Sequence, residues 1–217
     1  MANHKMIPDS AVVLCFQHCD KDTNIFCQAL PLHCPVCRGN LGETPMRIPP
    51  FRIPCPLVTS LEAPVSVVVR PTQGTFLRHY TKNSNLHIGI TSSKGEVYDY
   101  DEHGVHVCEG GWSECLPIQL AENCSMEYRE LWDSKLSEFA ALADWSSHRY
   151  SESHHNCYDF VLSFLQYMQM EQHYPSVCSH SQFVEQMVVP RTSQVAKYIT
   201  LYRRVQAQGI VLQPKNS

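Results

Sequence analysis

The strictest pattern in this sequence is an alternation of aliphatic and other residues over Leu86–Thr91. The aliphatic residues of this stretch share one face of an extended strand, and His87 lies on the other face. Gly89 lies on the same face as His87, and its missing side chain leaves space there. Ser92–Gly95 predicts a turn and Glu96–Tyr100 predicts a returning strand. Any fold of this chain must therefore contain an antiparallel hairpin.

A second constraint is the apolar stretch Phe160–Met170, in which apolar residues recur at helical spacing. Asn156 is a suitable N-cap for this helix, which places Cys157 in the first turn and facing inward. The positive end of the helix dipole favours the thiolate form of such a cysteine. Position alone leaves two interpretations open, a nucleophile and a small buried apolar residue, and favours the second.

The remaining periodic segments predict further strands and helices, so the expected fold class is α+β. A helix is predicted over Met126–Ala143, and a shorter one over Ser181–Met187 ends at Val188–Arg191. Residues 103–106 are expected to lead into a glycine-rich loop. Further strands are predicted at Val12–Leu14, Asn24–Cys27, Val65–Arg70, Leu116–Leu120, Lys197–Arg203 and Gly209–Leu212.

The composition of the chain changes along its length and predicts three parts. Residues 1–42 form a small module rich in cysteine and histidine, and residues 43–64 form a proline-rich linker. Residues 65–217 form the α+β domain, which carries the predicted hairpin and the Cys157 helix.

The N-terminal module contains a set of residues suited to one structural zinc ion. Cys34 and Cys37 are separated by two residues and followed by a glycine, which is the form of a zinc knuckle. The second pair is expected from His18 and Cys19, with Cys15 as an alternative to His18. The competing interpretation is a group of reduced cysteines in a small β-hairpin.

Charge and composition exclude several classes of function. The formal net charge is −4 and no basic block stands out, so nucleic acid is not an expected partner. The sequence shows neither an apolar run long enough for a bilayer nor a secretion signal, so no membrane is expected. The odd number of cysteines, 11, suits reduced thiols in a soluble protein of the cytoplasm or nucleus.

Three short motifs of the main domain resemble the circularly permuted papain-like fold. They are His87-x-Gly89-Ile90 on a strand, Val97-Tyr98-x-Tyr100 on the returning strand, and Asn156-Cys157-x-x-Phe160 at a helix start. In that fold the histidine strand precedes the cysteine helix, and the likeness covers roughly residues 65–170. The permuted desumoylating and deubiquitinating isopeptidases look closest; the NlpC/P60-like and lecithin-retinol acyltransferase-like proteins are more distant.

This resemblance implies that Cys157 is a nucleophile and His87 its general base. Asn156, Asp99 and Tyr98 are the supporting residues it suggests, Asp99 and Tyr98 as groups that orient His87. It further implies a cysteine hydrolase acting on a protein or peptide-like substrate, in particular ubiquitin-like conjugates. The alternatives are a catalytically inactive protein-interaction module on the same fold and a lipid-using acyltransferase, for which no membrane anchor is evident.

Five further stretches carry a second likeness: PTQGTFLR, HIGIT, HHNCY, VVPRT and ITLYR. Through them the whole chain resembles the makorin-2 opposite strand protein family. The family name records a position in the genome, so membership implies no activity.

Overall fold

The computed structural model describes residues 12–108, 112–120 and 124–215 of the 217-residue chain. These residues form two compact units: the residues up to Pro56 together with those from Lys197 onward, and Leu57–Ala196. Each unit contains an antiparallel sheet, and helices accompany the sheets, so the chain is α+β as expected. The predicted division at residues 42 and 64 remains a prediction.

The first unit is built on a four-stranded sheet with the order β3-β1-β2-β9. A buried cluster that includes Phe16, Ile25 and Leu41 packs against this sheet. β9 follows Gly209, whose φ of 73° suits glycine because it has no Cβ; it confirms the predicted strand at this position and pairs with β2. The strands are β1 (Leu14–Gln17), β2 (Thr23–Cys27), β3 (Ile48–Arg52) and β9 (Ile210–Pro214).

The second unit contains a five-stranded antiparallel sheet with the order β7-β6-β5-β4-β8. The predicted hairpin forms its centre, as β5 and β6 pair with Gly89 opposite Asp99. β7 was not expected, because residues 103–106 indicated the approach to a loop; it is a partly exposed edge strand that pairs with β6. The strands are β4 (Ser66–Pro71), β5 (Leu86–Thr91), β6 (Val97–Asp101), β7 (Gly104–Cys108) and β8 (Leu116–Gln119).

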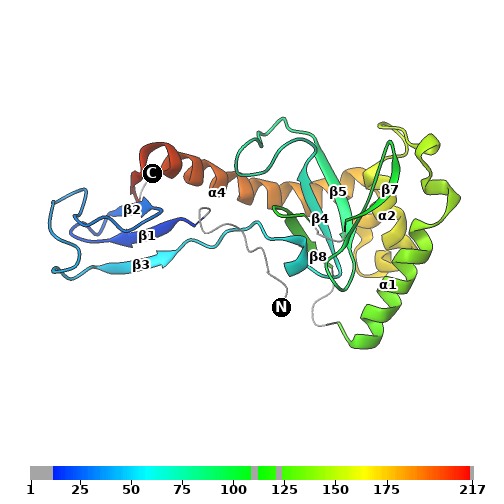
Figure 1. Ribbon diagram of the computed structural model, residues 1–217, viewed down its shortest axis with the longest axis horizontal. Helices are drawn as coiled ribbons and strands as arrows, with labels where there is room; N and C mark the ends of the chain where they lie inside the picture. The colour runs from blue at the N-terminus through cyan, green and yellow to red at the C-terminus, as the bar shows by residue number, and fades with distance from the viewer. Residues whose placement is uncertain (1–11, 109–111, 121–123, 216–217) are drawn as a thin grey trace. The chain divides into compact units, whose positions relative to one another are not determined.

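Two helices, α1 (Met126–Ala140) and α2 (Cys157–Tyr167), cover the aliphatic face of this sheet (Figure 1). The ring centroids of Phe160 on α2 and Tyr100 on β6 are 6.2 Å apart. Trp132 on α1 meets Phe164 edge to face at 4.9 Å, and its indole N–H donates to the Thr91 carbonyl at 2.9 Å. Each such buried aromatic side chain stabilises the fold by roughly 1.5–3 kcal/mol. The predicted helices at Met126 and after Asn156 are thus present.

The predicted strand at Lys197–Arg203 is wrong, because these residues lie within α4 (Val189–Gln208). The β-branched and aromatic residues of this stretch mimic a strand when they are read alone. Val195, Tyr198 and Val205 are buried and recur at helical intervals, so the helical period prevails over a wider window.

The predicted helix end at Val188–Arg191 is also wrong. The chain runs from α3 (His180–Phe183) through a π-helical turn, Val184–Val188, directly into α4. Pro190 has no N–H to give to the preceding turn, and the Arg191 guanidinium donates instead to the Met187 carbonyl at 2.9 Å. The described residues also form five short 3₁₀ turns: Ser60–Glu62, Ala143–Trp145, Ser147–Arg149, Met170–Gln172 and Pro175–Cys178.

Candidate functional site

The start of α2 is fixed by a reciprocal pair of hydrogen bonds. The Asn156 side chain accepts from the Tyr158 N–H at 2.8 Å, and the Asp159 carboxylate accepts from the Asn156 N–H at 2.8 Å. The Asn156 amide also donates to the Glu152 carbonyl at 2.8 Å, which ties the preceding loop to the helix. Asn156 is therefore the N-cap, as predicted, and Cys157 is the first residue of α2.

His87 on β5 and Asp99 on β6 form a buried pair. Nε2 of His87 lies 2.7 Å from Oδ2 of Asp99, and the two side chains are 11% and 7% exposed. Their geometry follows from the β5–β6 register, which places Asp99 opposite Gly89, two residues from His87 and on the same face. A Cβ on residue 89 would lie 3.2 Å from the Asp99 Cβ and 2.7 Å from a Val97 methyl carbon, so glycine permits this close approach.

Cys157 completes the group by approaching His87. Its side chain is buried, with 7% of the residue exposed, so it faces inward as expected. Burial lowers the pKa of His87, but interactions with Asp99 and Cys157 outweigh it and raise that pKa to about 9. The imidazolium form of His87 is thus favoured near neutral pH, with a carboxylate on one side and a thiol on the other.

Tyr98, the other residue predicted to orient His87, does not lie beside it. It pairs with Ile90 across the β5–β6 ladder, and strand alternation directs it to the face opposite Asp99. Burial is the main cause that raises its pKa. Of the two residues suggested for orienting His87, the structure therefore brings Asp99 to it and not Tyr98.

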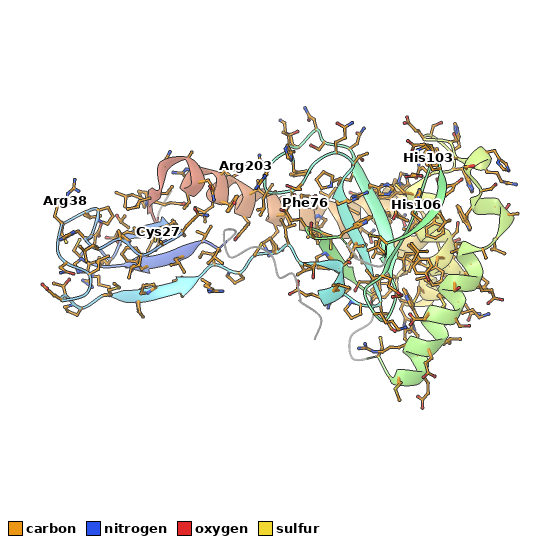
Figure 2. The ribbon with its side chains drawn as sticks, in the orientation of Figure 1. Cys27, Arg38, Phe76, His103, His106 and Arg203 are labelled. Atoms are coloured by element: carbon orange, nitrogen blue, oxygen red, sulfur yellow. The ribbon has the colours of Figure 1, made fainter. Side chains whose placement is uncertain are left out.

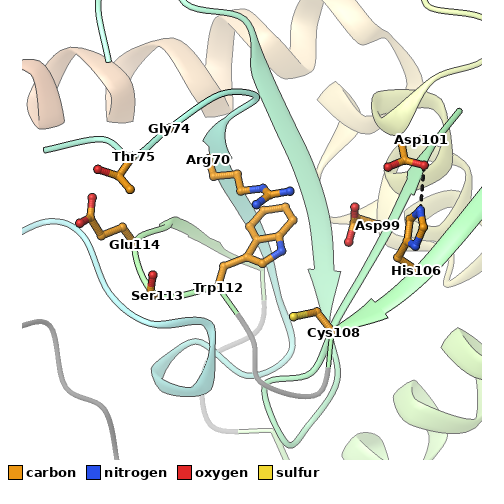
Figure 3. A pocket seen from close by; sticks show the side chains of 10 residues that line it. All are labelled: Arg70, Gly74, Thr75, Asp99, Asp101, His106, Cys108, Trp112, Ser113 and Glu114. Atoms are coloured by element: carbon orange, nitrogen blue, oxygen red, sulfur yellow. Dashed lines mark hydrogen bonds and ion pairs between the residues drawn. The ribbon is translucent and has the colours of Figure 1, made fainter. Parts of the chain in front are cut away.

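A cavity of about 430 Å³ adjoins the buried pair on the same face of the sheet. Asp99 lines it together with Asp101 and His106, which are joined at 2.8 Å (Figure 3). His106 lies near His103 at the β6–β7 turn (Figure 2). The other lining residues are Arg70, Gly74, Thr75, Cys108, Trp112, Ser113 and Glu114.

Two residues beside His87 were not predicted from the sequence. Arg70 stands opposite His87 in the β4–β5 register, and its guanidinium carbon lies 4.5 Å from the Trp112 ring. The rings of Trp112 and His87 are 5.8 Å apart. These contacts join residues that lie far apart in the sequence, and that of Arg70 depends on the pairing of β4 with β5. Their residue types gave no local signal, except that a tryptophan follows a glycine-rich loop.

In the first unit, the four residues predicted as metal ligands converge. One ligand atom from each of His18, Cys19, Cys34 and Cys37 lies within 4.8 Å of all the others. The Cys37 sulfur is 3.3 Å from Nδ1 of His18, and the Cys19 and Cys34 sulfurs are 4.0 Å apart. Such spacings suit four ligands arranged around one ion, so the cluster is able to hold a metal.

Hydrogen bonds from outside the cluster support its ligand atoms. The Val36 N–H donates to the Cys34 sulfur at 3.4 Å, and the backbone N–H of Gly39 lowers the pKa of Cys37 to about 7. Nε2 of His18 contacts the Thr44 hydroxyl at 2.7 Å, which leaves Nδ1 directed at the cluster. The sequence pattern predicted the four ligands, whereas nothing in it singled out Thr44.

None of the helices built from the described residues combines the length and the apolar character that crossing a bilayer requires.

Comparison with known proteins identifies the family. The DUF4796 C-terminal model matches residues 50–205, and the DUF4796 N-terminal model matches residues 12–41. The MKRN2 opposite strand protein of Homo sapiens is 38% identical over 194 residues, which cover 89% of this chain and 86% of that protein. No solved structure matches the chain. The expected likeness to the makorin-2 opposite strand family is confirmed, and the chain belongs to the DUF4796 family.

Proposed function

We propose that this chain is a cysteine hydrolase in which Cys157 is the nucleophile, His87 the general acid and base, and Asp99 the residue that orients His87. The observation that carries the proposal is the position of His87 between a buried carboxylate and a thiol at a helix start. We further propose that the β5–β6 hairpin and α2 form the core of a circularly permuted papain-like fold. The order of histidine strand before cysteine helix supports this assignment.

In the first half of the reaction, the Cys157 thiolate attacks the carbonyl carbon of an amide and a C–S bond forms. The His87 imidazolium then gives its proton to the leaving nitrogen as the C–N bond breaks, which releases an amine and leaves a thioester. Asp99 holds the imidazole ring in place through Nε2. The backbone N–H of Cys157, at the start of α2, is placed to stabilise the negative oxygen that develops.

In the second half, neutral His87 takes a proton from water, and the resulting hydroxide attacks the thioester carbon. The C–S bond breaks, the carboxylic acid product leaves, and Cys157 returns to its thiolate beside the imidazolium. Each proton that His87 gives in the first half is recovered in the second, so the residues end in their starting state. The cycle needs no cofactor in addition to water.

The substrate class we favour is a protein or peptide-like amide, in particular an isopeptide bond in a ubiquitin-like conjugate. The resemblance of the His87, Tyr98 and Cys157 motifs to permuted isopeptidases supports this choice. The alternative is a protein-interaction module without activity, which the burial of Cys157, 7% exposed, favours because a substrate must reach the sulfur. Both forms would keep the same fold, so chemistry has to distinguish them.

Selective alkylation of Cys157 tests the proposal. A thiolate–imidazolium pair reacts with iodoacetamide near about pH 6, where an ordinary thiol of pKa about 8.5 is almost wholly protonated. Peptide mapping by mass spectrometry should find Cys157 modified at least about tenfold faster than the buried Cys115 thiol, whose pKa burial raises to about 12.

His87→Gln should remove this selectivity while keeping a hydrogen-bond donor for the buried Asp99 carboxylate. His148→Ala, which alters an exposed histidine, should leave it intact, and Cys157→Ser must abolish the signal at position 157. Slow labelling of Cys157 across about pH 6 to 8, unaffected by His87→Gln, would leave the interaction module as the better account.

A second proposal concerns the first unit, where we infer one structural zinc ion bound by His18, Cys19, Cys34 and Cys37. The convergence of four ligand atoms within 4.8 Å supports it, as do the N–H groups around the sulfurs. Two nitrogen or oxygen ligands would suit harder metals, whereas three thiolates and one imidazole suit zinc.

Elemental analysis of the purified protein tests this proposal and should find one equivalent of zinc. The Cys34→Ser variant should lose the zinc. If the metal-free protein unfolded at the same urea concentration as the zinc-bound protein, a structural role for the metal would be contradicted.

A further inference from the structure

The cavity beside the His87–Asp99 pair has the size of a binding site for a small ligand or a short chain segment. Its volume is about 430 Å³, within the range of known ligand pockets, and its lining residues all belong to the second unit. Two of them, Asp99 and Trp112, are in contact with His87. A molecule in this cavity would therefore lie next to the His87–Asp99 pair.

Two residues that line the cavity, Arg70 and Thr75, each have a buried polar side-chain atom without a hydrogen-bond partner, and Arg70 is the charged one. Its Nε is buried and has no hydrogen-bond partner, and the flat guanidinium is held over the Trp112 ring at 4.5 Å. A buried donor without an acceptor is costly, and such groups are rare unless a ligand or water completes them. Figure 3 shows this guanidinium facing the cavity beside Trp112.

The carboxylates around the cavity already have partners. Glu114 accepts from the Leu77 N–H at 3.2 Å, and Asp101 accepts from the His103 N–H at 2.8 Å in addition to its contact with His106. Asp99 is bound to His87. The carboxylates that line the cavity therefore need no further donor, whereas Nε of Arg70 still needs a hydrogen-bond acceptor.

We propose that this cavity binds an extended peptide segment of the substrate and that Arg70 donates to one of its main-chain carbonyl groups. The inference rests on the proposed hydrolase for its link to Cys157. A neutral carbonyl satisfies Nε, whereas a phosphate or carboxylate would also face the charges of Asp99, Asp101 and Glu114. An alkyl chain would leave Nε unsatisfied. Arg70 is accordingly a specificity residue that favours peptides over lipids.

Nuclear magnetic resonance of the indole N–H groups tests binding directly. The chain has three tryptophans, and Trp112→Phe identifies the signal of residue 112. In a Cys157→Ser background, millimolar N-acetyl-Ala-Ala-Ala-amide should shift the Trp112 signal in a saturable way. Inorganic phosphate should leave the signal nearly unmoved. N-hexylacetamide, whose single amide carbonyl reaches Arg70 without the rest of a peptide chain, should not saturate the shift at the concentration that suffices for the peptide.

Arg70→Met keeps an unbranched side chain and removes the donor, so it should weaken peptide binding roughly tenfold. Arg78→Met is the matched control at an exposed arginine and should bind as the parent does. Ser113→Phe fills the cavity from an exposed rim position and should also abolish the shift, which covers the case in which Arg70→Met fails to fold.

The inference is overturned if the peptide fails to move the Trp112 signal, or if Arg70→Met and Ser113→Phe both bind it normally. A saturable response to N-hexylacetamide or phosphate in place of the peptide would assign the cavity to a different ligand. Because the Cys157→Ser background has no nucleophile, these results are independent of the alkylation experiment. Failure of the hydrolase proposal and failure of this one are therefore distinguishable.

Discussion

Nε2 of His87 lies 2.7 Å from Oδ2 of Asp99, and both side chains are almost withdrawn from water. Imidazole has two nitrogen atoms, and with Nε2 engaged by Asp99 the atom available to Cys157 is Nδ1. The carboxylate thus fixes both the ring orientation and the nitrogen that serves the thiol. This relationship makes the pH behaviour of the molecule predictable.

Asp99→Asn should flatten the pH dependence of stability. The pKa of His87 is raised from 6.5 to about 9, so the stabilisation it supplies is complete below about pH 6.5 and disappears as the pH rises through 9. The parent should therefore lose stability over this interval relative to Asp99→Asn, by on the order of 1–2 kcal/mol. Urea unfolding at several pH values measures the difference, and parallel curves for the two proteins would contradict the assignment.

Asn156→Ala should lower both the stability of the fold and the reactivity of Cys157. Loss of the N-cap costs about 1 kcal/mol and frays the turn that holds the thiol. Ser125→Ala is a matched control, since Ser125 caps α1 by accepting from Tyr128 N–H at 3.2 Å. It should cost a similar free energy of unfolding without changing the rate of Cys157 alkylation. Equal effects on that rate would show that Asn156 has no special relation to the thiol.

Gly89→Ala should destabilise the second unit by roughly 1–3 kcal/mol, because the new methyl group overpacks the sheet. Its Cβ would lie 2.7 Å from a Val97 methyl carbon and 2.9 Å from the Tyr98 carbonyl oxygen. Gly42→Ala, whose nearest contact would be 3.4 Å, is the control. Thermal unfolding compares the two, and an unchanged midpoint for Gly89→Ala would mean that the strands relax without cost.

Thr44→Val should weaken zinc binding about tenfold without removing a ligand. The Thr44 hydroxyl contacts Nε2 of His18 and so holds the ring with Nδ1 toward the sulfurs. Competition with a chelator measures the affinity, and Thr72→Val at an exposed position provides the control. Identical affinities for the parent and Thr44→Val would show that the Thr44 contact does not hold His18 for metal binding.

The sequence predicted those elements whose pattern is local and strong. The alternation in Leu86–Thr91 and the cap at Asn156 act over a few residues, so both were found. Lys197–Arg203 was wrongly predicted as a strand because the β-branched residues in these seven positions are typical of strands. The helical periodicity of the longer helix that contains them becomes visible only over a wider stretch of sequence. β7 was not predicted, because a partly exposed edge strand does not need the alternation of apolar and polar residues that identifies a strand in a sequence.

For the candidate site, the resemblance to the permuted papain-like fold was needed to propose Cys157 and His87, and it did not choose between Asp99 and Tyr98. That choice depends on strand register, since neighbouring residues of a strand point to opposite faces. Arg70 reaches His87 only through the pairing of β4 with β5. Contacts between segments distant in sequence depend on the packed fold, which local patterns do not contain.

The pairing of β2 with β9 sets an order of events during synthesis. Thr23–Cys27 leaves the ribosome early, but its partner Ile210–Pro214 follows only after most of the chain. At typical translation rates of about 5–20 residues per second, β2 has an open edge for on the order of ten seconds or more. The four residues of the proposed zinc site, His18, Cys19, Cys34 and Cys37, leave the ribosome together with β2. The proposed site can therefore form before β9 completes the sheet.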